Sequence, residues 1–383
     1  MHYLFSKFIC SISYLYGEKS MYSHDKNNIL RHYLKGKAAS SSGRFLCNLD
    51  SLLDTVQIFD VEKMHAVIKA HSSKNNLSRN HQRYIDWLGD TAGFLPLATV
   101  PVTIFEKLDE LLLQFPNFAE VIGYYREQMA LATVAERPAF AANPLLIAGP
   151  PGVGKTAFCQ ALSKIVSTHY ELISFSGITA GFVIGGNSSS WAEGKPGKVV
   201  EALARGHRAN PLIVMDEIDK TGGDKRYDPL GALYQLLEKE TSANFVDEGL
   251  EVATDCSRIV WVGTANNLDL IAEPIISRFT IIEVNQPTPK QMENVLRSIY
   301  QKVRRNHPWG EQFSEDLSPL VVSKIIDSDL APRLLQRELV SACGKAVLRN
   351  ATKKMPGNCQ HSINPDDFRP REYSKRPIRM GFV

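Results

Sequence analysis

The sequence predicts an α/β protein organised around a phosphate-binding loop, with helical regions on both sides of it. Residues 145–156 spell LLIAGPPGVGKT, in which a short apolar run leads into a glycine-rich loop. A second apolar run, Leu212 to Met215, ends in the acidic pair Asp216-Glu217. Short β-branched runs of this kind are typical of buried strands, whereas apolar residues recur at helical spacing before and after this region.

The composition is that of a globular protein. The chain has 383 residues, of which 44% are hydrophobic and 22% charged, so it is long enough for two or three domains. Its net charge of +3 is too small to indicate binding to nucleic acid or to an anionic membrane. The six cysteines are far apart and form no C-x-x-C pair, so neither a zinc site nor a disulfide framework is expected. We therefore expect a reducing, cytoplasmic compartment and no membrane association.

Residues 1–43 are expected to be a flexible or mis-annotated N-terminal segment. The run from Tyr3 to Tyr16 is apolar enough to resemble the core of a signal peptide, but Lys7 interrupts it and no small-residue cleavage site follows. The run is also too short to span a bilayer. Met21 is an alternative start of the protein.

Residues 44–114 are expected to form a helical N-terminal domain. Apolar residues recur there at helical spacing in three groups: Phe45, Leu49, Leu52, Leu53 and Val56; Val61, Met64, Val67 and Ile68; and Tyr84, Trp87 and Leu88. Such stripes are usually core, so no chemistry is assigned to them.

Two further helices are expected at Ile104 to Leu113 and at Val121 to Val134. They are separated at Pro116, which disfavours helical backbone for the residue before it. Phe118, Val121 and Ile122 lie just upstream of the loop, where they either pack on an adenine ring or pack only between helices.

The loop itself has the pattern G-x-x-x-x-G-K-T from Gly149 to Thr156 and opens directly into a helical pattern. Small residues let backbone N–H groups turn towards phosphate oxygens, and the helix N-terminus adds unpaired donors and a positive dipole end. Lys155 is expected to contact the β- and γ-phosphates, and the Thr156 hydroxyl to bind Mg²⁺. The residues expected to contact nucleotide are Gly149, Pro150, Pro151, Gly152, Val153, Gly154, Lys155, Thr156 and Ala157.

A second strand is expected from Tyr170 to Phe175, and a third at Leu212 to Met215. A carboxylate at the end of a strand beside a phosphate loop can hold Mg²⁺ through water, and the next can deprotonate an attacking water. We therefore predict that Asp216 is the metal residue and Glu217 the catalytic base.

Three more polar residues follow in chain order. Asn266 comes after the predicted strand Ile259 to Thr264 and is suited to holding the lytic water. Arg278 precedes the strand Thr280 to Val284, where it is expected to face away from its own nucleotide. Arg333 begins a predicted helix that runs to about Leu348, from which it is placed to touch phosphate.

The order of these motifs along the chain resembles that of the AAA+ ATPases, and within them that of the ATPase module of Lon-type proteases. The similarity covers roughly residues 143–350 and is carried by GPPGVGKT, KPGKVVEAL, NPLIVMDEIDK, DPLGALYQLLE, FVDEGLEV, TANNLDLIAEPIISRF and PRLLQREL. The resemblance implies a P-loop NTPase with a five-stranded parallel sheet, a small helical lid and assembly into a ring, usually a hexamer. It also implies ATP and Mg²⁺ as cofactors, Asn266 as sensor 1, Arg278 as an arginine finger for the neighbouring subunit and Arg333 as sensor 2.

The remaining domain boundaries follow from the resemblance: 115–287 for the α/β nucleotide-binding domain, 288–355 for the lid and 356–383 for a basic tail. Lon chains continue into a peptidase domain with a Ser-Lys dyad, whereas this chain ends at Val383, so we expect no peptidase of its own and allow for a separate peptidase partner. Ser341 and Lys345 have the spacing of a pair within one helix and are expected to be surface and packing residues. The lid helix begins Ala-Pro-Arg where the family has Gly-Val-Arg, and no counterpart is assigned to the tail residues Arg369, Arg371, Lys375, Arg376 and Arg379.

The expected function is Mg²⁺-dependent ATP hydrolysis that drives protein remodelling or unfolding, as in a chaperone. A nucleic-acid loader or helicase is an alternative, for which the tail and Lys225-Arg226 supply little positive charge. A regulatory nucleotide switch is another, although Glu217 and Arg278 argue against it. Trp191 lies five residues before Pro196, where Lon carries the aromatic residue of the pore loop; it is expected either to grip a polypeptide there or to pack on the helix Val199 to Ala204.

Overall fold

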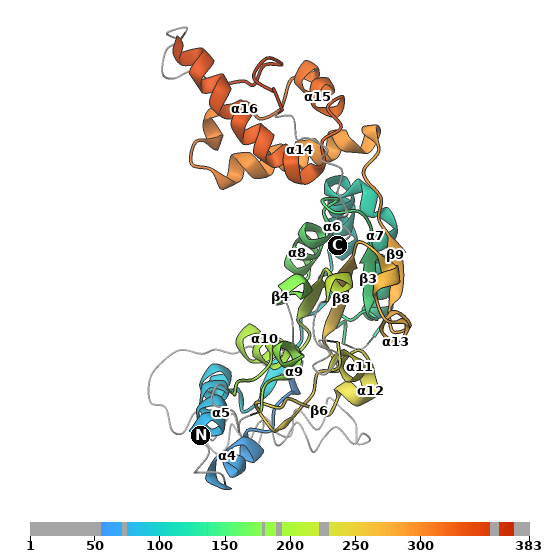
Figure 1. Cartoon of the computed structure of the whole chain (residues 1–383), viewed down its shortest axis with the longest axis vertical. Helices are drawn as coiled ribbons and strands as arrows, with labels where there is room; N and C mark the ends of the chain where they lie inside the picture. Colours follow the sequence, from blue (N-terminus) through green and yellow to red (C-terminus); the bar gives the residue numbers. More distant parts are fainter. Residues whose placement is uncertain are drawn as a thin grey trace, which may run out of the picture.

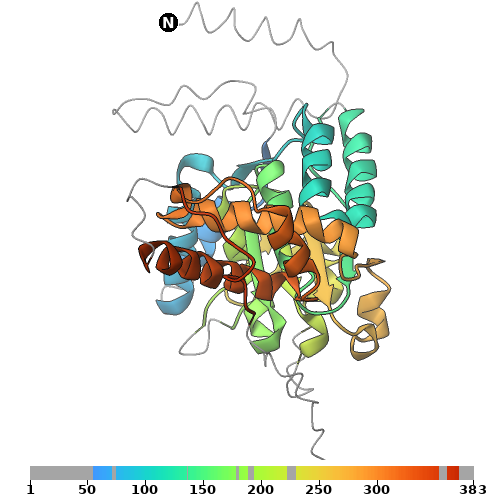
Figure 2. The ribbon, with the colours of Figure 1, turned by 90° about the horizontal axis from the view of Figure 1, so that it is seen from above.

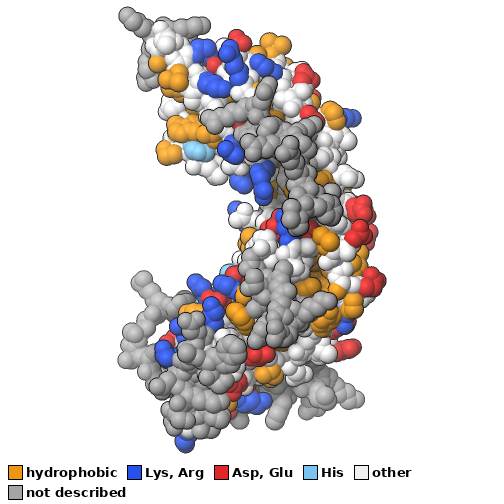
Figure 3. Space-filling view, viewed as in Figure 1, with side chains coloured by type: hydrophobic (Ala, Val, Ile, Leu, Met, Phe, Trp, Pro, Cys, Tyr) orange, Lys and Arg blue, Asp and Glu red, His pale blue; other side chains and the backbone are white. Residues whose placement is uncertain are grey.

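The computed structural model describes residues 55–70, 75–135, 137–177, 181–188, 194–221, 230–352 and 360–370. A parallel sheet with its helices occupies the middle of the molecule, with N-terminal helices at one end and a helical lid at the other (Figure 1). In the space-filling view the outline is curved, and the lid and the N-terminal helices form the two ends of the curve (Figure 3). No helix in the described ranges is both long enough and apolar enough to cross a bilayer.

The N-terminal region contains two short strands as well as the expected helices. Strand β1 (Thr55–Gln57) pairs antiparallel with β2 (Phe94–Pro96), and Val56 lies opposite Leu95. The helices between them are α4 (Val61–Ala70) and α5 (Asn75–Leu88), as the second and third apolar stripes predict. The first stripe was wrong at Val56, because this β-branched residue pairs in β1; the rest of that stripe lies outside the described residues.

The next two helices were predicted almost to the residue. Helix α6 (Ile104–Gln114) ends before the turn at Pro116, and α7 (Ala119–Thr133) follows it. These two helices lie side by side (Figure 2). Both pack in one hydrophobic core with the loop helix α8 (Lys155–Ile165). The packing therefore joins α6 to the α/β domain. The domain boundary expected at residue 114 instead groups α6 with the N-terminal helices.

The central sheet has five parallel strands, as predicted. Their order is β4-β5-β8-β3-β9, and every neighbouring pair is parallel. The strands are β3 (Leu145–Ala148), β4 (Tyr170–Ser174), β5 (Leu212–Asp216), β8 (Val260–Ala265) and β9 (Thr280–Glu283). In doubly wound sheets of this kind, ligands bind beyond the carboxyl ends of the strands. The loop after β3 lies at that edge, next to the ends of β8 and β9.

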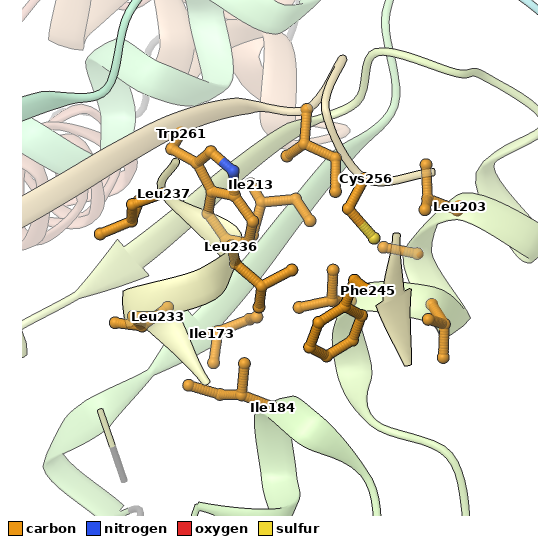
Figure 4. Close-up of a cluster of buried hydrophobic side chains, with 14 of the residues drawn as sticks. Ile173, Ile184, Leu203, Ile213, Leu233, Leu236, Leu237, Phe245, Cys256 and Trp261 are labelled. Carbon is orange, nitrogen blue, oxygen red and sulfur yellow. The ribbon is translucent and has the colours of Figure 1, made fainter. Parts of the chain in front are cut away.

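Two cores cover the two faces of the sheet, because successive side chains of a strand point to opposite faces. Leu212 and Val260 pack with α6, α7 and α8 on one face, whereas Ile213 and Trp261 pack on the other. Figure 4 shows Trp261 and Ile213 in the second core with Leu203, Phe245 and Cys256. This face is covered by short elements: α9 (Phe182–Gly185), α10 (Lys198–Gly206), α11 (Leu233–Leu236), α12 (Lys239–Ser242), α13 (Glu273–Ile276), and the strand pair β6 (Phe245–Val246) and β7 (Ala253–Thr254).

The lid is a three-helix unit with its own core. It consists of α14 (Pro289–Asn306), α15 (Pro319–Ile326) and α16 (Pro332–Thr352). Residues 360–370 pack onto it: the Asp367 carboxylate lies 3.0 Å from Arg349, and Phe368 is buried in the lid core. This part of the predicted tail, which includes Arg369, is thus part of the lid, whereas Arg371, Lys375, Arg376 and Arg379 lie outside the described residues.

Candidate active site

The phosphate-binding loop lies at the carboxyl edge of the sheet, and its glycines have backbone angles that other residues rarely adopt. Gly149 has φ 152° and Gly154 has φ 110°. A Cβ atom at Gly149 would lie 2.1 Å from the Val284 carbonyl oxygen, so this position requires glycine. Gly154 immediately precedes α8, and its Cβ position would face Phe115 and Phe118. The loop therefore folds closely against β9 and ends at a helix N-terminus, as an anion-binding loop does.

Lys155, the first residue of α8, points back over the loop. Its Nζ atom donates to the carbonyl oxygens of Gly149 at 2.6 Å and Pro150 at 3.2 Å, and to Asn266 Oδ1 at 3.0 Å. Burial lowers the pKa of Lys155, and the nearby carboxylates of Asp219, Asp216 and Glu217 oppose that effect. The structure thus brings two of the predicted site residues, Lys155 and Asn266, into direct contact at the end of β8.

Thr156 and Asp216 also meet. Thr156 Oγ1 donates to Asp216 Oδ1 at 3.0 Å, and Thr264 Oγ1 donates to the same oxygen at 2.7 Å. Thr264 in turn accepts from the Glu217 backbone N–H at 3.0 Å. Thr264 was not predicted as a site residue. Its signal lay in the register: β5 pairs with β8 through Met215 and Gly263, which places Asp216 and Thr264, the next residues, side by side.

Glu217 occupies a left-handed backbone conformation, with φ 57° and ψ 50°. A non-glycine residue in this region is uncommon, and such residues cluster at functional sites. Its Oε1 atom accepts from Lys220 Nζ at 2.7 Å. That hydrogen bond and ion pair lower the pKa of Glu217, with smaller contributions from Ser176 and Arg333. Lys220 and Ser176 were not predicted as site residues.

Asp219 is a further buried carboxylate beside the site. Its Oδ2 atom accepts from the Asn267 backbone N–H at 3.2 Å, so it ties the turn after β8 to the segment after β5. Its Oδ1 atom is buried and has no hydrogen-bond partner among the described residues. Only 7% of Asp219 is exposed, and its negative charge acts on Lys155.

The two predicted arginines lie in different places. The start of α16 faces the loop: a Cβ atom at Gly152 would lie 3.7 Å from Ala331 Cβ and 3.9 Å from Arg333 Cβ. Arg278 follows α13 and pairs with Glu238, with 3.1 Å between Nε and Oε1. Arg333 therefore belongs to the neighbourhood of the loop, and Arg278 lies against α12.

The adenine candidates are fully buried side chains. Phe118 stacks on Phe158 with 4.8 Å between ring centroids, and Val121 and Ile122 are at most 2% exposed. Phe115 is partly exposed and packs edge-on against both phenylalanines. The packing alternative thus accounts for Phe118, Val121 and Ile122 in this structure.

Several predicted features lie elsewhere. Trp191 and the Lys225-Arg226 pair fall outside the described residues. Ser341 and Lys345 share α16, and Lys345 Nζ donates to the Arg369 carbonyl oxygen at 3.3 Å. That contact agrees with a packing role for Lys345.

The residues at the loop fit a nucleotide bound with a magnesium ion. Among the described residues, no group of three or more His, Cys, Asp and Glu is placed to hold a metal by itself. Mg²⁺ commonly takes one or two protein oxygens together with phosphate oxygens and water. Thr156 Oγ1 and the Asp216 carboxylate are oxygens of that kind, and they are in contact.

Comparisons with known proteins agree with this geometry. Residues 145–286 match the family described as ATPase family associated with various cellular activities (AAA). Lon protease 2 of Sorangium cellulosum is 27% identical over 314 residues, which are 78% of this chain and 38% of that protein. The mitochondrial Lon protease homolog of Drosophila melanogaster is 33% identical over 220 residues, 57% of this chain and 21% of that protein. The chain thus spans well under half the length of these relatives.

A solved structure shares the fold. The chain superposes on Hsp104 of S. cerevisiae, from a complex titled with casein in an extended conformation, with a TM-score of 0.51. The match covers 65% of this chain and 48% of that chain at 12% sequence identity. At this identity the similarity supports the AAA+ fold and says nothing of the substrate.

Proposed function

Because the chain carries an AAA+ ATPase domain related to that of Lon proteases, we propose that it hydrolyses ATP with Mg²⁺ in a ring-shaped oligomer and uses that energy to remodel or unfold proteins. The observation that carries the proposal is the meeting of Lys155, Thr156, Asp216 and Asn266 at one edge of the sheet, with Glu217 beside them. Lys155 and Thr156 begin α8, Asp216 ends β5 with Glu217 directly after it, and Asn266 follows β8.

Each side chain has a distinct task in this proposal. Lys155 binds phosphate oxygens in place of the carbonyl oxygens of Gly149 and Pro150 that it contacts here. Thr156 and Asp216 would hold the magnesium ion, which would neutralise charge on the phosphate oxygens. Asn266 orients the attacking water, and Glu217 takes its proton. A carboxylate can serve as the general base in this step.

In this proposal the Glu217 side chain has two positions, one bonded to Lys220 and one directed at the attacking water. While Lys220 Nζ is bonded to Oε1, that oxygen is occupied by a cation rather than by water. In the proposed cycle, Glu217 turns from Lys220 to the attacking water. The exposure of the Lys220 side chain, 47%, leaves it room to withdraw.

The position of Arg278 supports the proposal of assembly. It lies against α12 on its own chain, whereas Arg333 is next to the phosphate loop. An arginine that lies away from the phosphate loop of its own chain is suited to act on the nucleotide of a neighbouring subunit. We therefore propose a ring, with a hexamer as the expected size.

A protein substrate is supported by the relatives, whose names describe proteases, and by the mild net charge of the chain. The pore-loop role of Trp191 belongs to the same proposal. The described residues supply ATPase chemistry, and the peptide-bond chemistry of the relatives is not assigned to them.

The test is capture of substrate by Glu217→Gln in the presence of ATP, with Lys155→Ala as the control that lacks nucleotide binding. We expect proteins to be retained by the first variant and released on ADP exchange, and none to be retained by the second. Purified wild-type protein should show ATPase activity that rises with an unfolded protein such as casein and not with DNA. Stimulation by DNA alone would replace the protein-remodelling proposal with a nucleic-acid function, and stimulation by neither would favour a nucleotide switch.

A further inference from the structure

Arg278 is held against its own chain by three different contacts. Its Nε atom pairs with Glu238 Oε1 at 3.1 Å, and its Nη1 atom donates to the Pro274 carbonyl oxygen. Its guanidinium carbon lies 5.5 Å from the centre of the Tyr234 ring, within the range of a cation–π contact. Only 24% of the Arg278 side chain is exposed.

These contacts come from three segments of the chain. Tyr234 lies in α11, Glu238 directly precedes α12, and Pro274 lies in α13, just before Arg278 itself. The ring of Tyr234 packs against the buried core of this face, so its position is fixed. The guanidinium is thus bounded by a rigid ring, a carboxylate and a backbone carbonyl.

The contacts leave one edge of the guanidinium available. Nη1 donates to the Pro274 carbonyl oxygen, and Nε lies 3.1 Å from Glu238 Oε1 as an ion pair without hydrogen-bond geometry. Among the described residues, no acceptor is found for Nη2. Arginine donates from a rigid, planar fork, so fixing two nitrogens sets the direction of the third. A freely rotating arginine would have to lose that freedom each time it met a phosphate.

The Arg278–Glu238 ion pair is not explained well by a contribution to folding stability. Glu238 is half-exposed, and ion pairs of such exposure contribute little to folding. The carboxylate also neutralises the charge that an arginine finger carries. An orienting role explains both features, because Glu238 approaches from the Nε side and leaves the Nη2 edge free.

We propose that Glu238 and Tyr234 are positioning residues that orient Arg278 towards the nucleotide of the neighbouring subunit. This inference rests on the proposed function, in which Arg278 acts in trans. Glu238 is then needed by the subunit that supplies the arginine and not by the subunit that binds the ATP.

The test is subunit mixing. Glu238→Ala should lower kcat by about 10- to 100-fold, since a small displacement of a catalytic group is enough for such a loss, while the KM for ATP and the melting temperature stay close to wild type. Mixing Glu238→Ala with Glu217→Gln should restore activity, because the second variant binds ATP and still offers an oriented arginine. Mixing Glu238→Ala with Arg278→Ala should restore none, because neither supplies an effective finger.

Matched variants separate positioning from folding. Glu240→Ala makes the same change at an exposed position in α12, two residues after Glu238, and should behave as wild type. Tyr234→Phe retains the ring and should keep its activity, whereas Tyr234→Leu should lose activity in the same mixing pattern as Glu238→Ala. Glu238→Asp should keep part of the activity, because it retains the charge.

The reference mixture is Arg278→Ala with Glu217→Gln. Suppose that this reference mixture is active. If Glu238→Ala is then rescued only by Arg278→Ala, or by neither partner, Glu238 does not position Arg278, although Arg278 still acts in trans. If the reference mixture is itself inactive although the variants co-assemble, the trans finger fails and this inference fails with it.

Discussion

Lys155 Nζ lies 3.0 Å from Asn266 Oδ1, so the first residue of the loop helix is tied to the residue that follows β8. Glu217 is close by but bonds to Lys220 and Thr264 instead. Lys155 and Glu217 therefore have separate partners, and mutation can test their roles one at a time. Lys155 belongs to the phosphate loop and Glu217 to the end of β5.

We predict that Lys155→Ala abolishes nucleotide binding, whereas Glu217→Gln binds ATP and loses turnover. Lys155 contacts phosphate before the reaction, and Glu217 acts on water during it. Equilibrium binding of a fluorescent ATP analogue and a phosphate-release assay measure the two effects. Hydrolysis by Glu217→Gln at a rate near wild type would show that another residue is the base.

The second prediction is that hydrolysis depends on protein concentration. Arginine fingers supplied in trans are worth about 10³ to 10⁵ in rate, so a monomer, whose ATP site receives no Arg278 from a neighbour, should be nearly inactive. Specific activity should climb steeply with concentration and follow the formation of the oligomer seen by light scattering. A specific activity that is constant from the most dilute sample upward would contradict a shared site.

Much of the site was predictable because its signals are continuous in sequence. Leu145 to Thr156 contains a strand, a loop and a helix start in one run, and Asp216-Glu217 marks the end of a second strand. Thr264 and Ser176 were not predictable in this way. Their places beside Asp216 and Glu217 arise from the register of β8 against β5 and from the turn after β4, which pair residues far apart in the chain.

At both ends of the fold, too, contacts between residues far apart in the chain were not predicted. Helical spacing identified α4 and α5, but it extended the first stripe into Val56, which pairs with Leu95 across 39 positions of chain. Composition described the C-terminal residues as a basic tail, whereas Asp367 and Phe368 return to the lid. In both cases a long-range contact decides the structure, and a local pattern does not contain it.

The third prediction concerns Trp191. As a pore residue it should leave the melting temperature and the basal ATPase unchanged in Trp191→Ala, while unfolding of a protein substrate is lost. As a packing residue it should cost about 3–5 kcal/mol of stability when truncated. Thermal unfolding and a substrate-unfolding assay, run on the same preparation, separate the two, and full retention of unfolding activity would remove the pore assignment.

The fourth prediction is a pH dependence from Asp247. This carboxylate is completely buried and accepts backbone hydrogen bonds from Gly197 at 2.7 Å, Gly249 at 2.8 Å and Leu250 at 3.0 Å. Burial raises its pKa from 3.8 to about 7 despite those bonds. The folded protein therefore holds this proton more tightly than the unfolded chain does. Its contribution to stability is largest below the unfolded pKa and is lost as the pH rises through about 7.

Asp247→Asn removes that titration. The stability of the wild type relative to Asp247→Asn should fall by about 2–3 kcal/mol between pH 5 and pH 8, because about two of the roughly three pH units between the unfolded and folded pKa values lie in that range. Urea unfolding of both proteins at each pH measures the difference, and the shared response of all other groups cancels. If the stability of the wild type relative to Asp247→Asn stays constant or increases as the pH rises, Asp247 is ionised throughout this range in the folded protein.

The last prediction concerns Asn80, which joins the N-terminal helix α5 to the α/β domain. Its Nδ2 atom donates to the carbonyl oxygens of Gly194 at 3.1 Å and Gly249 at 3.2 Å, and the residue is only 5% exposed. Gly249 also approaches the chain at Lys195 so closely that a Cβ atom would lie 2.4 Å from that carbonyl. One buried amide therefore connects three segments: α5, the chain before α10 and the turn after β6.

Asn80→Ala leaves two carbonyl oxygens without this donor, and the bond to Gly249 is buried. Since a buried polar group left unpaired costs about 1–3 kcal/mol, we expect a loss of that order in the free energy of unfolding. Gln82→Ala is the matched control, because Gln82 lies in the same helix, is exposed and bonds to Asp86; surface changes of this kind usually stay within about 0.5 kcal/mol. Equal stability of the two variants in urea unfolding would mean that α5 is not held to the domain through Asn80, and that its contacts with α10 suffice.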